Sequence, residues 1–325
     1  MKELIEGRAA KRLGDVVDVI GFVCMTRADD VYFTPRHALR NAGVAPQYII
    51  ENVEGEYVRD WAISEPNTTI FPYDANLDPV SAIEAPAVHH FLWPHRTMLW
   101  LRREPNGDHR ELGKTWWEWS RFQRERFRSP LSIAFAFVAT HNHFVLDRGG
   151  KVFKQSAPII KLPATATEDD HLALLAYLNS SVACFWMKQV FHDKGSGTDS
   201  GKWQAERAKI AFEYTGTGLQ PLPIPKLSAD QRTRCIELAR SIETLSEQRL
   251  RLLDVAVPRE FDQVMTVDIL RQRIADASTQ YDVLLERMIY LQEELDWTIY
   301  AQFELLEPKV LARFRALPRD TRIPL

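Results

Sequence analysis

Two histidines stand close together in the stretch Ala139–Gly150, "ATHNHFVLDRGG", where His141 and His143 flank Asn142. On a β-strand the two imidazoles would share one face, and Asn142 would occupy the other. Two imidazoles on one face could hold a transition metal, but the surrounding sequence offers no third ligand. A metal-dependent nuclease would also spread such residues over a hairpin and a helix rather than over three consecutive positions. We therefore expect a structural or surface pair and no metal site.

The sequence contains no complete catalytic motif of a familiar kind. An enzyme that transfers a methyl group to a DNA base would need a glycine-rich S-adenosylmethionine loop and a [D/N/S]-P-P-[Y/F] motif, and neither is present. The glycines of "TGTGLQ" (Thr215–Gln220) lack a third partner and precede the proline-rich "LQPLPIP", which cannot supply the helix that phosphate binding requires. We interpret this segment as a turn. The sequence thus predicts no catalytic residues and no cofactor held by this chain itself.

A basic and aromatic stretch, "WWEWSRFQRERFRSP", offers a different chemistry. Arginine can pair with phosphate or read guanine, and aromatic rings can stack on bases or pack a core. Two interpretations stay open with even weight: a nucleic-acid contact, or core tryptophans beneath a solvated arginine face. The aromatic and basic residues concerned are Trp116, Trp117, Trp119, Phe122, Phe127, Arg121, Arg124, Arg126 and Arg128. Further lysines lie in or near glycine-containing loops, namely Lys151, Lys154, Lys188, Lys194 and Lys202.

Charge is distributed unevenly along the 325 residues, a length typical of about two domains. The net charge is −3, but residues 228–307 carry 9 basic and 16 acidic residues, and residues 308–325 carry 5 basic and 1 acidic residue. The three cysteines are far apart, which argues against a zinc site or a disulfide framework. The N-terminus lacks the apolar region of a signal peptide, and no apolar run is long enough to span a bilayer. We expect a soluble cytoplasmic protein with no membrane partner.

Periodicity predicts a strand-rich body followed by long helices. "DVVDVIGFVC" and "LSIAFAFVATHNHFVL" are strand-like, and the Asp147–Gly150 turn predicts a hairpin between the second of them and "GGKVFKQSAPIIKLP". A helix capped at Thr167 should break near Asn179 into a second helix. A capping box at Ser228 opens a long helix, and a heptad pattern over residues 270–295 predicts another, so the two should pack as an antiparallel pair.

The expected fold is therefore mixed α/β (α+β), with a long antiparallel helical pair after the body. The expected domains are residues 1–225 (body), 226–306 (helical pair) and 307–325 (basic tail).

Several segments, in order, resemble a known family. They are "IGFVCMTRADDVYFTP", "ENVEGEYVRDWAISEPNTTIFPYD", "HHFLWPHRTMLWLRRE", "LLAYLNSSVACFW" and "LQPLPIPKLSADQ". Together they resemble the C-terminal, TaqI-like target recognition domain of adenine-N6 DNA methyltransferases, found in type IIG restriction–modification enzymes and in the PglX methyltransferases of BREX phage defence. The stretch "HFVLDRGGKVFKQSAPIIKLP" looks closest to the PglX branch. The last two segments and the helical pair also resemble type I HsdS specificity subunits.

The resemblance implies sequence-specific recognition of double-stranded DNA for a methyltransferase domain or subunit that lies outside this sequence. That partner would bind S-adenosylmethionine. Because the acidic helices would repel DNA, we expect them to dock on protein, either the methyltransferase domain or a second specificity unit. The histidine triplet would belong to the scaffold. Two alternatives remain: a coiled-coil adaptor that binds protein, or one half of a split methyltransferase. The candidate DNA contacts are Arg59, Arg121, Arg124, Arg126, Arg128, Lys151, Lys154, Lys194 and Lys202.

Overall fold

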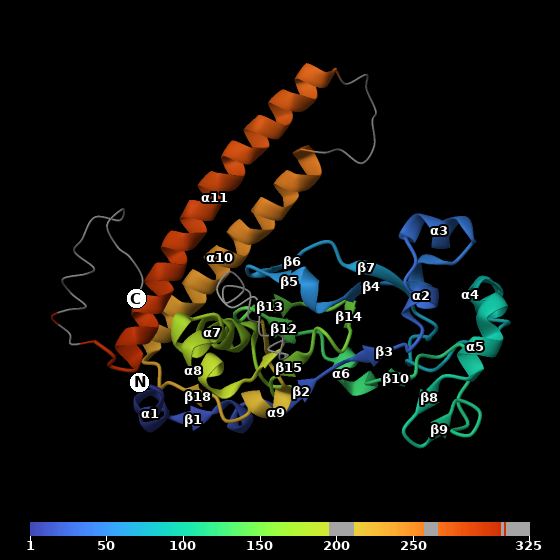
Figure 1. Cartoon of the computed structure of the whole chain (residues 1–325), viewed down its shortest axis with the longest axis horizontal. Coiled ribbons are helices and arrows are strands. Elements are labelled where there is room, and N and C mark those ends of the chain that lie inside the picture. Colours follow the sequence, from blue (N-terminus) through green and yellow to red (C-terminus); the bar gives the residue numbers. More distant parts are fainter. Residues whose placement is uncertain (195–210, 257–265, 307–308, 310–325) are drawn as a thin grey trace, which may run out of the picture.

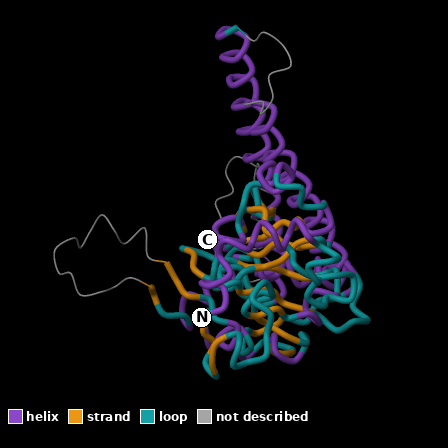
Figure 2. Tube along the Cα trace, turned by 90° about the vertical axis from the view of Figure 1, so that its right-hand side faces the viewer, coloured by secondary structure: helices purple, strands orange, loops and turns teal. Residues whose placement is uncertain are grey.

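The computed structural model describes residues 1–194, 211–256, 266–306 and 309. Two long helices project from a body of mixed helices and short strands (Figure 1). A view turned by a right angle shows the same body beneath the projecting pair (Figure 2). The predicted mixed fold with a long C-terminal helical pair is confirmed.

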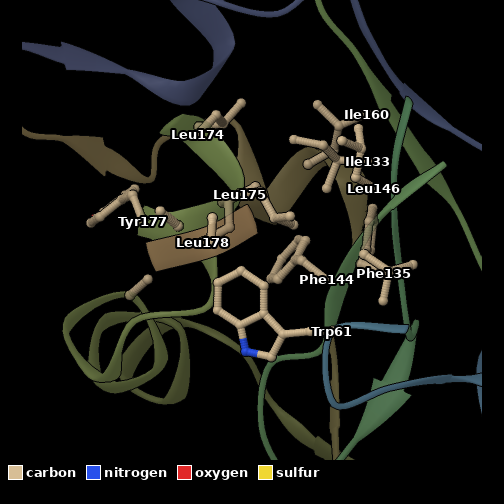
Figure 3. Close-up of a cluster of buried hydrophobic side chains, with 14 of the residues drawn as sticks. Trp61, Ile133, Phe135, Phe144, Leu146, Ile160, Leu174, Leu175, Tyr177 and Leu178 are labelled. Carbon is tan, nitrogen blue, oxygen red and sulfur yellow. The ribbon is translucent and has the colours of Figure 1, made fainter. Parts of the chain in front are cut away.

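The centre of the body is an antiparallel sheet in the order β13-β11-β15-β2. All four residues of both β11 and β13 are buried, which explains their apolar, β-branched and aromatic composition. The helix α7 packs against this sheet, and Figure 3 shows Leu175 and Leu178 of the helix close to Phe144 of β13. The bounds are β2 Val19–Gly21, β11 Ser132–Phe135, β13 Phe144–Asp147, β15 Ile159–Lys161 and α7 Glu168–Leu178.

The predicted hairpin at Asp147–Gly150 is wrong. The strand after the turn, β14 (Lys151–Phe153), leaves the central sheet and pairs in parallel with β4 (Ile49–Val53), which also pairs with β7 (Asn67–Ile70). Gly149 and Gly150 both have left-handed backbones, with φ of 99° and 81°, and they redirect the chain. The antiparallel partner of β13 is instead β11, which precedes it in the chain. "LSIAFAFVATHNHFVL" is thus three strands and not one.

The two consecutive helices predicted after Thr167 are confirmed. Thr167 accepts a hydrogen bond from the backbone of Asp170 and forms a capping box, and α7 ends at Leu178 before Asn179. The second helix, α8 (Ser181–Val190), begins after Ser180, whose side chain caps it. The TGTGLQ segment differs from the predicted turn because Gly216–Leu219 form a single helical turn, α9. A Cβ at Gly218 would lie 2.3 Å from the Phe191 ring, so close packing explains this glycine.

A second hydrophobic core lies beside the central sheet. Its buried members include Tyr32, Leu39, Tyr73, Leu99 and Trp119. We call the part of the body built on this core, residues 27–48 and 71–128, the distal lobe; it occupies the end of the molecule away from the helical pair (Figure 1). Its elements are α2 Asp29–Tyr32, α3 Arg36–Asn41, η2 Pro46–Tyr48, α4 Pro86–Leu92, η4 Trp93–His95, α5 Arg96–Trp100, β8 Arg103–Glu104, β9 Gly107–Asp108, β10 Arg121–Phe122 and α6 Arg124–Arg128.

The helical pair consists of α10 (Ala229–Ala256) and α11 (Val267–Gln302), which run in opposite directions side by side (Figure 1). The predicted capping box is present, since Ser228 and Gln231 exchange hydrogen bonds of 2.9 and 3.3 Å. One face of the N-terminal half of α10 is buried, and the helix packs against α7. The outer part of α11 is mostly exposed. Of its predicted seam positions, Ala277, Tyr281 and Leu284 are half-buried, as a seam facing α10 requires, whereas Ile274 is exposed.

The remaining elements connect these parts. Short strand pairs join β1 to β18, β3 to β10, β5 to β6, and β12 and β16 to β17. The bounds are α1 Lys2–Gly7, β1 Lys11–Arg12, η1 Leu13–Asp15, β3 Cys24–Met25, η3 Gly55–Tyr57, β5 Val58–Arg59, β6 Ala62–Ile63, β12 Val138–Ala139, β16 Asp193–Lys194, β17 Ala211–Glu213 and β18 Pro223–Ile224. In the part of the chain that the structure describes, no helix combines the length and apolarity that crossing a bilayer needs.

Candidate nucleic-acid interface

The four arginines of the basic and aromatic stretch lie together on β10 and α6. Arg121 Nε is 2.6 Å from a carboxylate oxygen of Glu104 on β8. Arg124 is 2.6 Å from Asp78, and Arg128 is 2.9 Å from Glu125. These three guanidinium groups therefore have carboxylate partners within the chain, which reduces the positive potential that they present to an anion.

Arg126 has a different role. Its Nη1 donates a hydrogen bond of 2.5 Å to the backbone carbonyl of Phe22. A Cβ on Gly21 would lie 2.6 Å from the same nitrogen, so the guanidinium passes directly over this glycine. Burial lowers the pKa of Arg126 from its usual value. This arginine fastens α6 to the end of β2 and is partly withdrawn from solvent.

The aromatic residues of this stretch pack into the second core. Trp116 and Trp119 are 6% and 1% exposed. Trp119 and Phe122 make edge-on ring contacts with each other and with Phe71, at centroid distances of 5.3 to 5.8 Å. Of the two interpretations left open by the sequence, packing is the one observed for these rings.

The other candidate contacts lie on separate elements. Lys151 pairs with Asp147 at 3.1 Å, and Lys154 pairs with both Asp29 and Glu54 at 2.6 and 3.0 Å. Arg59 donates from Nη1 to the carbonyl oxygens of Gly55 and Val58 at 2.5 and 2.6 Å, and Lys194 lies 3.4 Å from Glu213. Lys202 lies outside the described residues. All eight described candidates thus have a partner inside the chain.

The His141–Asn142–His143 triplet lies in the loop between β12 and β13, not on the strand that the sequence predicted. The strand ends at Ala139 because the chain must reverse before β13 pairs with β11. The two imidazole rings still lie side by side, 4.3 Å between centroids. Burial lowers the pKa of His143 to about 4 and also lowers that of His141, so both rings are neutral at pH 7. Within the described ranges, no group of three or more His, Cys, Asp or Glu side chains could hold a metal ion.

These histidines line a cavity of about 670 Å³ between the body and the helical pair. The β5–β6 hairpin closes one side of it through Asp60 and Trp61, whose φ angles of 48° and 71° form its tight turn. The Trp61 indole donates to Gln292 of α11 at 3.1 Å, and Arg249 of α10 lies 3.7 Å from Asp60. We interpret this region as the structural joint between the body and the helices.

A second basic and aromatic segment, Pro86–Arg103, lies on α4, η4 and α5 of the distal lobe. Part of it carries the family resemblance, but its side chains were not among the DNA contacts predicted from the sequence. In contrast to the buried Trp116 and Trp119, Trp93 is 57% exposed. The signal available from the sequence is that this segment contains no aspartate or glutamate.

The chain is similar to the adenine-specific methyltransferase PglX of Streptomyces coelicolor. The two are 35% identical over 309 residues, which cover 94% of this chain and 24% of the relative. This chain therefore spans about a quarter of the length of the curated relative that it matches. Its structure also has a loose likeness to the type IIG restriction endonuclease BpuSI, with a TM-score of 0.45 and 10% sequence identity over 90% of this chain and 33% of that protein. No family model matches the sequence. The chain is thus related over nearly its whole length to the adenine-specific methyltransferase PglX, which confirms the family resemblance predicted from the sequence motifs.

Proposed function

We propose that this chain recognises double-stranded DNA for an adenine-N6 methyltransferase of a restriction–modification or phage-defence system. The observation that carries this proposal is the relationship to PglX over 94% of the chain. The S-adenosylmethionine loop and the proline-proline motif of such enzymes are absent from this sequence. The methyl transfer itself would therefore belong to a methyltransferase domain or subunit, which would bind the cofactor, and this chain would contribute the choice of site.

The distribution of charge supports different binding roles for the helical pair and for the body. Residues 228–307, which include α10 and α11, carry 16 acidic against 9 basic residues, so they repel a phosphate backbone. The helical pair is held to the body by ion pairs such as Arg148 with Glu243 at 2.8 Å. In the proposal, the helices dock on the methyltransferase and hold the body in a defined orientation toward DNA.

The proposal is tested by selecting a pool of random duplex DNA on the purified chain and sequencing the bound fraction. Enrichment of one motif would support a self-sufficient recognition module and would identify its site. Salt-sensitive binding without enrichment would support DNA contact and would place the source of specificity in the complex with the methyltransferase. Absence of binding at low salt would contradict the proposal and favour a protein-binding adaptor.

The split-enzyme alternative predicts a different result. There the chain would act only when combined with a separately produced methyltransferase domain, and adenine methylation would be lost when either part is omitted. A methylation assay on the selected DNA, with and without this chain, measures that dependence directly. Methylation at the same sites and rate without the chain would contradict both versions.

A further inference from the structure

The α4–η4–α5 segment of the distal lobe exposes large apolar side chains over a short distance. Trp93, Met98 and Leu101 are 57%, 47% and 65% exposed. Their neighbours Leu92 and Leu99 are fully buried, so the segment is anchored in the second core while these three face solvent. Three large exposed apolar side chains within nine residues of an anchored segment make it a candidate binding surface.

Three arginines accompany these side chains. The Arg96 guanidinium lies over the Trp93 ring at 4.4 Å, and that of Arg110 lies over the Trp100 ring at 5.1 Å. Arg103 is exposed on the adjoining strand β8. Among the residues that the structure describes, none of these three guanidinium groups forms an ion pair with a carboxylate, in contrast to Arg121, Arg124 and Arg128. We call Trp93, Arg96, Arg103 and Arg110 the aromatic–basic surface.

The acidic groups nearest in sequence are already engaged. Glu104 has a side chain only 7% exposed, and it pairs with Arg121 and Arg27. Asp108 accepts hydrogen bonds of 2.9 Å from the backbone of Arg110 and Glu111, and Glu111 accepts one of 2.8 Å from the backbone of Asp108. The backbone bonds orient the Asp108 and Glu111 carboxylates without neutralising them, and among the described residues neither carboxylate forms an ion pair with Arg96, Arg103 or Arg110.

A buried arginine fixes the geometry of this surface. Arg102 is 5% exposed and donates hydrogen bonds to the carbonyl oxygens of Leu99 and Thr26 at 2.9 and 2.7 Å. It also donates to those of Trp116 and Glu118 at 2.8 Å each. The end of α5 is thereby tied to β3 and to the 116–118 loop. A surface held in place in this way loses little conformational entropy when it binds.

We propose that the aromatic–basic surface is a duplex DNA contact of this chain, in which Arg96, Arg103 and Arg110 neutralise phosphates and Trp93 packs against sugar or base. The inference rests on the proposed function and assigns it to residues other than the ion-paired cations that the sequence singled out. Guanidinium groups without carboxylate partners and the exposed Trp93 ring together match a polyanion with planar, stackable groups. The surface also lies at the end of the molecule away from the acidic helical pair, which suits simultaneous contact with DNA and a protein partner (Figure 1).

The test compares two variants that remove three positive charges each. One carries Arg96→Gln, Arg103→Gln and Arg110→Gln. The control carries three substitutions on exposed arginines of the helical pair, namely Arg251→Gln, Arg271→Gln and Arg273→Gln. Trp93→Ala is made separately. Binding to a labelled random-sequence duplex is measured by fluorescence anisotropy over a range of salt, and thermal unfolding of each variant is followed by circular dichroism to establish that it folds.

The surface variant should lose at least about tenfold in affinity, and its slope of log K against log salt should shrink by about 2.7, since each phosphate contact contributes about 0.9. Trp93→Ala should weaken binding about fivefold with the slope unchanged, because the substitution removes apolar contact area and no charge. The control should stay within about threefold of the unaltered chain, because its charges lie away from the contact.

Two outcomes separate this inference from the proposed function. If the unaltered chain binds DNA and the surface variant binds as tightly as the control, the assignment to this surface fails while DNA recognition stands. If the unaltered chain does not bind duplex DNA, the proposed function fails and the assignment with it. A surface variant that keeps DNA binding but no longer associates with a methyltransferase subunit would make the surface a protein interface, and would equally overturn the assignment.

Discussion

Replacing Arg148 with methionine should weaken the attachment of α10 to the body. Arg148 follows β13, and its two terminal nitrogens lie 2.8 Å from the two carboxylate oxygens of Glu243 on α10. One of these nitrogens also pairs with Glu168 at the start of α7, at 2.9 Å. Methionine keeps much of the apolar stem and removes the charge, so the variant tests the ion pair rather than packing.

The expected cost follows from burial. The Glu243 side chain is 8% exposed, whereas that of Arg148 is 42% exposed. Leaving a fully buried charge without its partner costs about 3–5 kcal/mol, and a solvent-exposed pair contributes about 0–1 kcal/mol. Because water can reach the position of Arg148 but hardly that of Glu243, we expect the free energy of unfolding to fall by about 2 kcal/mol.

The structure supplies a matched control, an ion pair between α10 and α7. Arg240 of α10 pairs with Asp169 of α7 at 2.7 Å, but the two side chains are 54% and 52% exposed. Arg240→Met should therefore cost less than about 0.5 kcal/mol. The double variant Arg148→Met/Glu243→Gln removes the orphaned charge and should recover much of the loss. Urea unfolding curves measure all of these, and the reasoning is refuted if Arg148→Met costs no more than Arg240→Met, or if the double variant recovers nothing.

Two further perturbations test other parts of the structure. Burial is the main cause that raises the pKa of the Asp296 carboxyl group to about 6. The folded state therefore binds a proton at Asp296 more tightly than the unfolded chain does. The resulting stabilisation is present below about pH 4 and is lost as the pH rises through about 6. The stability of Asp296→Asn relative to the unaltered chain should therefore rise between pH 4 and pH 7, by up to about 3 kcal/mol for a pKa shift of about two units. Urea unfolding at both pH values measures this difference, and a difference that is the same at pH 4 and pH 7 would contradict it. A Cβ at Gly55 would lie 2.3 Å from the carbonyl oxygen of Ser156, so Gly55→Ala should destabilise by about 1–3 kcal/mol, whereas Gly7→Ala, with open space around it, should not; equal melting temperatures for the two variants would contradict this.

Features encoded locally were predictable from the sequence. The capping boxes at Thr167 and Ser228, and the heptad pattern of residues 270–295, depend on residues within a few positions of one another. The hairpin at Asp147–Gly150 failed because the sequence does not reveal which distant strand pairs with β14. Its partner β4 lies about a hundred positions earlier in the chain, and nothing in the local pattern distinguishes it from β13.

The candidate site was harder to predict because residue type alone does not reveal whether a charged or aromatic side chain is buried, exposed or ion-paired. Trp93 and Trp119 both lie in aromatic, arginine-containing stretches, yet one is exposed and the other is buried. Arg121 and Arg103 likewise differ in whether a carboxylate lies within reach, which depends on how β8 and β10 approach each other. The sequence shows that the segment Pro86–Arg103 contains no acidic residue, but it does not show that this segment is exposed.

The proposed binding of this chain to duplex DNA is tested most directly by the salt dependence of that binding. Anisotropy titrations of the unaltered chain against a random-sequence duplex, at several salt concentrations between roughly 50 and 200 mM, give the slope of log K against log salt. If three guanidinium groups neutralise phosphates, the slope is about −2.7 or steeper. A slope near zero, or no measurable binding at the lowest salt, would contradict the account.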